Sequence, residues 1–381
     1  MAQHWIEIDG NAYRRNLRAF RGITAPGVRL MAVVKADAYG HGVRCITPLA
    51  RDERVDYLGI HSLAEYEAIR DLVGDLPVCL LGPTLPEEAS DVAAAGVEPT
   101  VSSLEVARAL AVAARANDRP IPIHIKLETG THRQGIHPEE IPDWCRLLSE
   151  ESGLRFRGLH THYANIEDTT DHTFARHQVV RLREGRACFI ANGQTPEITH
   201  SACSAAAIVM QQTHGEMIRL GIASYGLWPS RETYLSTLLS QRPGPELLPV
   251  LTWKTRVAQI KEVAAGEYVG YGCAFRATRA MRLAVLPIGY SDGYDRRLSA
   301  QGYVLLRGRR APVVGRVCMN MTMVDVSDAS DVSLGEETVL LGQSGGEEIT
   351  ADALAALCGT INYEIVSRLG RHIPRRLADR P

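Results

Sequence analysis

A lysine at the end of an apolar run is the first residue of this sequence that could do chemistry. The run from Arg29 to Val34 resembles a short buried strand, and Lys35 follows it, just before a loop that contains Gly40 and Gly42. A lysine at the mouth of an apolar pocket has a lowered pKa, which makes its amine a Schiff-base nucleophile or a base. An ordinary surface lysine after a strand would give the same pattern, so this stretch alone leaves both interpretations open.

Other polar and cationic residues follow further apolar runs in the same way. Together these residues would suit an anionic ligand, although each one alone is more often structural. They are Lys126, Glu128, Arg133, His160, His162, His200, Ser204 and Arg219.

The apolar runs themselves recur at regular intervals, with helix-like segments between them. Eight such β/α units in about two hundred residues predict an eight-stranded (β/α)8 TIM-type barrel, because open parallel sheets usually have fewer strands. The carboxyl ends of barrel strands meet at one face, so the residues above are expected to share one site. The expected strands lie at about 29–34, 57–60, 78–81, 98–101, 121–127, 156–162, 197–200 and 217–220.

The pattern changes after Trp228-Pro229. A cluster of chain breakers at 242–245 is followed by alternating runs typical of a mainly antiparallel β domain, expected at 251–263, 281–286, 313–317 and 321–326. We therefore predict a barrel domain at 1–238 and a C-terminal β-rich domain at 239–381. The first strand, residues 5–8, is a candidate for packing with the second domain.

Composition excludes several classes of function. The formal net charge of −2 and the pI of about 6.7 give no support for binding to nucleic acid or to an acidic membrane. The arginines between 368 and 380 are expected to form a solvated tail. Eight cysteines without a CxxC pair indicate reduced thiols and no metal site. With no export signal and no apolar run of membrane-spanning length, a cytoplasmic protein is expected.

The segment from Val33 to Gly42 also resembles, nearly letter for letter, the lysine motif of the alanine racemases. The resemblance implies that Lys35 holds pyridoxal 5′-phosphate through a Schiff base and serves as one catalytic base. Further segments extend the resemblance over nearly the whole chain. One of them, from Arg219 to Gly226, is similar to the family's arginine segment. There the guanidinium donates to the pyridine nitrogen, which must then remain an unprotonated acceptor. Such a ring is a weaker electron sink, which favours racemisation over transamination.

The resemblance assigns the remaining cofactor contacts residue by residue. Tyr39, Ser204 and Tyr363 match the family's phosphate ligands, and backbone amides at Gly221 and Ile222 would complete that site. His162 matches the histidine near the cofactor ring.

The substrate and the second base are assigned in the same way. Tyr271 matches the catalytic tyrosine, so Lys35 and Tyr271 would act on opposite faces of a planar carbanion. Arg133, Tyr290 and Met319 match residues around the substrate. Lys126 stands where the family has a carbamylated lysine, and a plain lysine on a strand is the alternative. The family also implies an isomerase that supplies D-alanine for peptidoglycan, acting as a head-to-tail homodimer with shared active sites.

Four positions depart from the usual family pattern, namely Glu128, Thr131, Cys203 and Asn320. None removes an acid, a base or a phosphate ligand, so they bear on substrate preference and rate. The alternatives are a racemase of serine or of a broader range of amino acids, a non-catalytic barrel that binds pyridoxal phosphate, and a decarboxylase of the same two-domain plan. The Tyr271 and Met319 segments speak against the non-catalytic barrel, which has no second domain.

Overall fold

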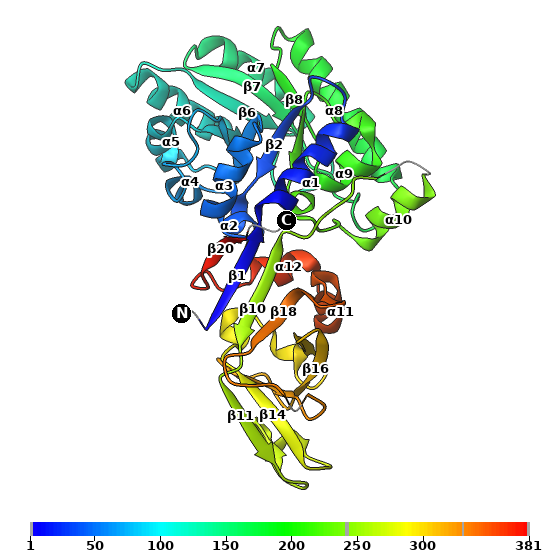
Figure 1. The fold of residues 1–381 in the computed structure, drawn as a ribbon. Helices are drawn as coiled ribbons and strands as arrows, with labels where there is room; N and C mark the ends of the chain where they lie inside the picture. Colours follow the sequence, from blue (N-terminus) through cyan, green and yellow to red (C-terminus); the bar gives the residue numbers. More distant parts are fainter. Residues whose placement is uncertain (1–2, 241–243, 330, 379–381) are drawn as a thin grey trace. The chain divides into compact units, whose positions relative to one another are not determined.

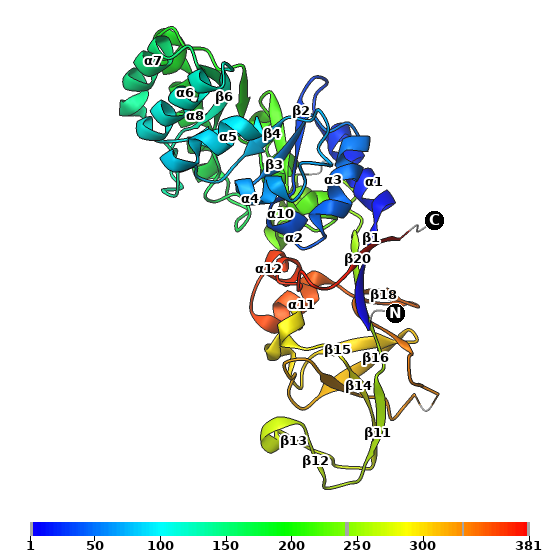
Figure 2. The same cartoon turned by 90° about the vertical axis from the view of Figure 1, so that its left-hand side faces the viewer.

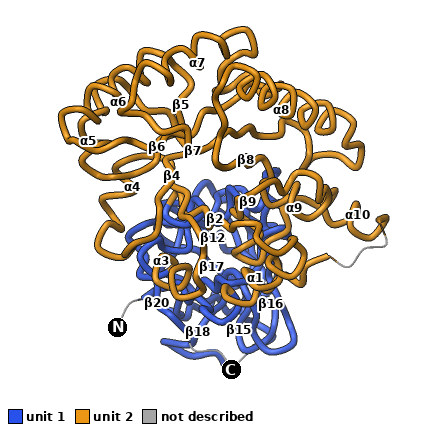
Figure 3. Tube along the Cα trace, turned by 90° about the horizontal axis from the view of Figure 1, so that it is seen from above, with its two compact units in different colours: residues 1–12, 37–45, 249–381 blue, residues 13–36, 46–248 orange. Residues whose placement is uncertain are grey.

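The structure, a computed structural model, describes residues 3–240, 244–329 and 331–378. The chain divides into two compact units (Figure 3). The barrel unit comprises residues 13–36 and 46–248, and the β unit comprises residues 1–12, 37–45 and 249–381. The predicted division at 238/239 stays a prediction, and part of the expected breaker cluster, residues 241–243, lies outside the described residues.

The barrel unit contains eight parallel strands, which confirms the predicted barrel. Their order is β8-β7-β6-β5-β4-β3-β2-β9, and the gap between β8 and β9 is crossed by bonds from Glu216 N to Thr199 O (3.0 Å) and from Arg219 N to Ala202 O (2.9 Å). The barrel is therefore nearly closed. The strands are β2 (Arg29–Val33), β3 (Tyr57–Ile60), β4 (Val78–Leu80), β5 (Glu98–Val101), β6 (Ile121–Lys126), β7 (Leu154–His160), β8 (Ile198–His200) and β9 (Met217–Leu220).

Helices connect the strands and lie around the outside of the barrel (Figures 1 and 2). The first helix begins where Asp9 Oδ1 accepts the N–H of Ala12 at 2.8 Å, and Asp9 is one of the two residues, with Asn11, that the sequence favours as its cap. The helices are α1 (Gly10–Ile23), α3 (Val43–Asp52), α4 (Leu63–Glu67), α5 (Ala89–Ala95), α6 (Leu104–Ala116), α7 (Ile141–Glu150), α8 (Thr173–Ala191), α9 (Ser204–Val209) and α10 (Arg231–Leu239). No helix among the described residues is long and apolar enough to cross a bilayer.

The β unit is built on a mainly antiparallel sheet, as predicted. Its strand order is β11-β14-β17-β16-β15-β18-β10-β1-β20, with β19 paired to β18 and with β12 and β13 forming a separate hairpin. The strands are β1 (His4–Asp9), β10 (Leu251–Arg256), β11 (Gln259–Val263), β12 (Tyr268–Val269), β13 (Phe275–Arg276), β14 (Met281–Leu286), β15 (Tyr303–Leu306), β16 (Arg309–Val314), β17 (Thr322–Asp325), β18 (Glu337–Ser344), β19 (Glu347–Ile349) and β20 (Arg375–Ala378). Two helices, α11 (Ala351–Cys358) and α12 (Asn362–Ser367), complete the unit.

The expectation of a solvated arginine tail agrees with the exposed Arg368, Arg371 and Arg376 but is wrong for Arg375. Strand β20 pairs in parallel with β1, which places Arg375 opposite Ile6. The Arg375 side chain is only 6% exposed and donates to the carbonyls of Gly40 (2.9 Å) and Ile373 (2.7 Å). A pairing between the two ends of the chain leaves no local signal in the sequence, which is why composition misled the prediction.

The residues after Lys35 form one unusual turn, α2 (Lys35–Tyr39). Its four residues from Ala36 to Tyr39 have φ between 53° and 55°, the left-handed region that costs non-glycine residues roughly 1–2 kcal/mol each. Hydrogen bonds from Gly42 N to Asp37 O (2.9 Å) and from Val43 N to Asp37 Oδ1 (2.8 Å) offset part of that cost. Strain held at one place in this way often marks a functional segment.

Candidate active site

The barrel unit gathers cationic residues at the ends of its strands. Lys35 follows β2 and is partly buried, and Lys126 ends β6 and is 5% exposed. Burial lowers the pKa of Lys35, and the guanidinium groups of Arg133 and Arg219 lower it further, against the opposing effect of Glu65. The same burial and the same two arginines lower the pKa of Lys126 to about 8. Both amines are therefore closer to their neutral, nucleophilic form than a surface lysine would be.

Arg219, on β9, is the buried centre of this cluster. Its Nη1 atom donates to Nδ1 of His200 at 2.8 Å, and its Nη2 atom donates to the carbonyl of Thr161 at 2.8 Å. Nη2 also lies 3.4 Å from Nδ1 of His162. The Nε atom makes no hydrogen bond to any residue that the structure describes, so this donor is free for a ligand acceptor.

His162 is a neutral neighbour of the cluster rather than another cation. Burial holds the pKa of His162 well below its usual value, and the charges of Arg219 and Arg133 act in the same direction. Its backbone carbonyl accepts the hydroxyl of Thr131 at 2.7 Å, which ties the loop after β6 to the end of β7. Glu128 holds the same loop, because its carboxylate accepts the backbone N–H groups of Gly130 and Thr131.

Ser204 and Gly221, two of the expected phosphate ligands, lie together where α9 faces the turn after β9. The Ser204 hydroxyl accepts the N–H of Gly221 at 3.1 Å and that of Ala223 at 3.4 Å. A hydroxyl grouped with two backbone amides is suited to phosphate, and the second amide belongs to Ala223, where the sequence predicts Ile222. The neighbouring Cys203 is buried, which raises the pKa of its thiol to about 12, so it is a neutral packing residue and not a nucleophile.

The β unit brings together the two tyrosines that the sequence assigns to phosphate binding. The ring centroids of Tyr39, at the end of α2, and Tyr363, on α12, are 6.1 Å apart. Gly40 makes this approach possible, since a Cβ atom there would lie 1.9 Å from the carbonyl oxygen of Val366. Two residues far apart in the sequence thus meet in one place, and their role as phosphate ligands stays a prediction.

The predicted catalytic tyrosine lies elsewhere in the same unit. Tyr271 and Met319 line one pocket of about 960 Å³ together with Tyr268, Asn320 and Met321. Tyr271 is 71% exposed and Met319 is 55% exposed. Asn320, one of the departures from the family pattern, donates its side-chain amide to the hydroxyl of Ser291 at 2.8 Å.

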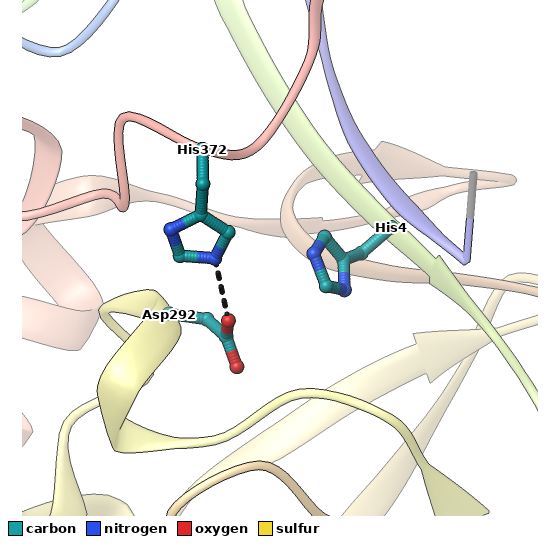
Figure 4. Close-up of side chains that lie close together, drawn as sticks. All are labelled: His4, Asp292 and His372. Atoms are coloured by element: carbon teal, nitrogen blue, oxygen red, sulfur yellow. Dashed lines mark hydrogen bonds and ion pairs between the residues drawn. The ribbon is translucent and has the colours of Figure 1, made fainter.

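Tyr290 belongs to a short turn that is fastened to the Met319 segment. Its backbone N–H donates to the carbonyl of Cys318 at 3.0 Å, and Gly289 permits this contact because a Cβ atom there would lie 2.2 Å from the same oxygen. From the other side, Asp292 accepts the N–H of Gly289 and a hydrogen bond of 2.9 Å from His372 (Figure 4). The sequence predicts Tyr290 as a substrate residue but gives no sign of this support by His372.

Two further buried polar residues, Glu98 and His124, lie behind Arg219 in the barrel core and are absent from the predicted site. A charged residue within the apolar strand 98–101 was the signal that could have identified Glu98.

The barrel and the polar residues at its strand ends are typical of a cofactor-dependent barrel enzyme. A lysine with a lowered pKa, a buried arginine with a free donor and a phosphate-type nest are what a barrel enzyme needs to hold an anionic ring cofactor and react with it.

Comparison with known proteins specifies the class further. Residues 8–229 match the family model of the alanine racemase N-terminal domain, and residues 250–377 match that of the C-terminal domain. The chain is 40% identical to an alanine racemase of Symbiobacterium thermophilum over 98% of this chain and 97% of the relative, and 39% identical to that of Desulfovibrio desulfuricans over 97% of each. The solved alanine racemase of Streptomyces coelicolor A3(2) is similar, with a TM-score of 0.90 and 33% identity over 99% of this chain and 98% of that one. The chain belongs to the alanine racemase family.

The family depends on pyridoxal 5′-phosphate, and the described residues fit that group. Ser204 with its amides suits the phosphate, the free Nε of Arg219 suits an acceptor on the ring, and Lys35 offers a reactive amine. Each feature belongs to the barrel unit.

Proposed function

We propose that this protein interconverts L-alanine and D-alanine with pyridoxal 5′-phosphate and two bases. The feature that carries the proposal is the cluster of Lys35, Arg133 and Arg219, in a chain that matches both alanine racemase domain models. The bound cofactor supplies an electron sink for the pair of electrons left when the substrate loses its α-proton. Lys35 takes or returns that proton on one face, and Tyr271 does so on the other.

The direct test is an assay that starts from each pure enantiomer. Incubation of either L-alanine or D-alanine with the holoenzyme should end in an equal mixture of the two. We expect a higher kcat/KM for alanine than for serine, because Tyr290 and Tyr363 would leave little room beyond a methyl group. A higher kcat/KM for serine would favour the serine racemase alternative, and no racemisation of any amino acid would favour a non-catalytic binder.

We predict that replacing Arg219 by glutamate changes which reaction the enzyme favours. In Arg219→Glu a carboxylate would face the ring nitrogen and favour its protonation, which makes the ring a stronger electron sink. Racemisation should fall by roughly 10²–10³-fold, while pyruvate formation from alanine should rise relative to it. The exposed Arg146, on α7, provides a control, since Arg146→Glu should change neither rate. An equal loss of both reactions with the cofactor still bound would show that Arg219 does not face the ring nitrogen.

We further propose that Lys126 is carbamylated and that the new negative charge pairs with Arg133. Carbamylation needs a neutral amine, and a pKa of about 8 leaves roughly a tenth of this amine neutral at pH 7, far more than for an ordinary lysine. Protein incubated with ¹³C-bicarbonate should therefore show a carbamate ¹³C signal that grows as the pH rises from about 6.5 to about 8.5. The signal should be absent from Lys126→Ala, and a signal that survives this change would assign the carbamate to another amine.

The assembly belongs to the same proposal. We infer a head-to-tail homodimer in which the barrel site of one chain uses Tyr271 of the other, with the protein in the cytoplasm and its D-alanine used for peptidoglycan. The exposure of Tyr271 and Met319 supports this, because a catalytic tyrosine left open to water would exchange its proton with solvent. The neighbouring Tyr268 and Met321 are also more than half exposed, at 58% and 55%, which gives the surface an apolar character suited to a partner.

A further inference from the structure

A continuous row of buried polar side chains extends from Arg219 along the barrel interior. Nη1 of Arg219 lies 2.8 Å from Nδ1 of His200, Nε2 of His200 lies 3.0 Å from Nδ1 of His124, and Nε2 of His124 lies 2.9 Å from Oε2 of Glu98. All four residues are at most 6% exposed. The row ends at the first residue of β5, away from the strand end that carries Lys126.

The donors in this row can point in only one direction. A guanidinium only donates, so Nδ1 of His200 must accept and the proton of this ring must be on Nε2. That proton is donated to Nδ1 of His124, whose own proton is then on Nε2 and is donated to the carboxylate of Glu98. Burial, with a further effect from the charge of Arg219, holds the pKa of His200 well below its usual value, which is consistent with a neutral ring. The positions of both imidazole protons are therefore set by the two ends of the row.

The surrounding backbone is shaped to hold the central imidazole of the row. The pairing of β6 with β7 shifts by a residue between Ile123 and His124, and the residue facing the His124 ring is Gly158. A Cβ atom at Gly158 would lie 2.0 Å from Nδ1 of His124, so the ring fills space that only a glycine leaves. The ring of His200 is held by a different contact. His160 stacks on it, with ring centroids 4.7 Å apart and ring planes 3° apart.

The far end of the row is anchored by charge. Oε1 of Glu98 lies 3.6 Å from the guanidinium of Arg157, and Arg157 in turn pairs with Glu197. Arg219 itself forms no ion pair with a carboxylate among the described residues. The carboxylate of Glu98, at the other end of the row, is joined to this buried cation only through the two imidazoles.

We propose that Glu98 and His124 are positioning residues for Arg219. By fixing the proton of His200 on Nε2, they keep Nδ1 as an acceptor for Nη1. This contact acts together with the carbonyls of His200, Thr161 and Ser201 to orient the guanidinium so that its Nε remains available to the cofactor ring. The inference rests on the proposed role of Arg219 in the racemase reaction. It adds two residues that touch neither cofactor nor substrate.

The first test locates the protons in the unmodified holoenzyme. Neutron diffraction, or ¹⁵N NMR of the histidine rings, should find a single proton on Nε2 of His200 and a single proton on Nε2 of His124. A proton on Nδ1 of either ring, or on both nitrogens of either ring, would overturn the inference. This measurement does not depend on activity, whereas a failure of the proposed function would appear as a wild-type protein that does not racemise alanine.

The second test reverses the direction of the hydrogen bonds in the row with one isosteric substitution. In Glu98→Gln the donor-only guanidinium of Arg157 selects the amide oxygen, so the NH2 group faces Nε2 of His124 and donates to it. Both ring protons then move to Nδ1, and an N–H of His200 points at an N–H of Arg219. We expect kcat for alanine to fall roughly tenfold with little change in KM, and the visible absorbance of the bound cofactor to shift. Glu98→Asp, which keeps the carboxylate, should recover most of kcat.

Glu197→Gln is the matched control, because it removes a carboxylate from the same chain of charges without touching a histidine. It should keep the kcat, absorbance and ring protons of the wild type. A Glu98→Gln enzyme with wild-type kcat and unmoved ring protons would contradict the proposal. If Glu98→Gln does not fold, the proton positions in the unmodified protein still decide the question.

Discussion

Lys35→Ala is expected to lower kcat for alanine racemisation by roughly 10⁴-fold or more, the scale seen when an essential nucleophile or base is removed. The reason is that this amine would both bind the cofactor covalently and carry the α-proton on one face of the substrate. Its lowered pKa, caused by burial and by Arg133, suits both roles. The variant should bind the cofactor only non-covalently and should lose it on extensive dialysis.

Borohydride labelling gives this prediction a readout that does not depend on rate. Reduction converts the carbon–nitrogen double bond between cofactor and lysine into a stable single bond, which peptide mapping can then locate. The chain has only four lysines, so the map is easily interpreted. Lys254 is held by Glu7 at 3.0 Å and Glu337 at 2.7 Å, and Lys261 lies exposed on β11. Label on any lysine other than Lys35 would refute the assignment, and Lys261→Ala should behave as the wild type.

Recovery of activity from two inactive variants is the second large expected effect. Lys35→Ala and Tyr271→Phe should each be nearly inactive as homodimers, since each lacks one of the two proposed bases. If each site uses Lys35 of one chain and Tyr271 of the other, a mixed dimer has one site with both defects and one site with neither. Random subunit exchange makes about half of the dimers mixed, so activity should recover to roughly a quarter of the wild type.

The matched control for the mixing experiment is a pair of variants that share one defect. Lys35→Ala mixed with Lys35→Met offers no intact site, whatever the architecture, and should stay inactive. Native mass spectrometry of one isotopically labelled chain would verify exchange. If exchange is complete and the Lys35→Ala and Tyr271→Phe mixture stays inactive, both bases act within one chain and the proposed shared site is wrong.

The sequence by itself determined the barrel, its approximate strand positions and the identity of the chemistry. Each barrel strand is a short apolar run that must be buried on both faces, so its position is visible locally as composition. Lys35 follows its run directly, Lys126 ends β6 and Arg219 lies within β9, and the strand-end rule of barrels predicts that such residues share one face. The sequence left Asp9 and Asn11 as alternative caps of the first long helix, and the structure shows Asp9 in that position.

The tertiary structure alone decided the features that depend on partners far apart in the chain. Strand β20 and the burial of Arg375 follow from pairing with β1 at the other end of the sequence, and a basic segment gives no sign of that pairing. The row from Arg219 to Glu98 needs β5, β6, β8 and β9 to converge, so each of its histidines looks like an isolated core residue until the barrel closes. Periodicity tells which side of a strand is buried, but the direction of a hydrogen bond is fixed only when donor and acceptor face each other.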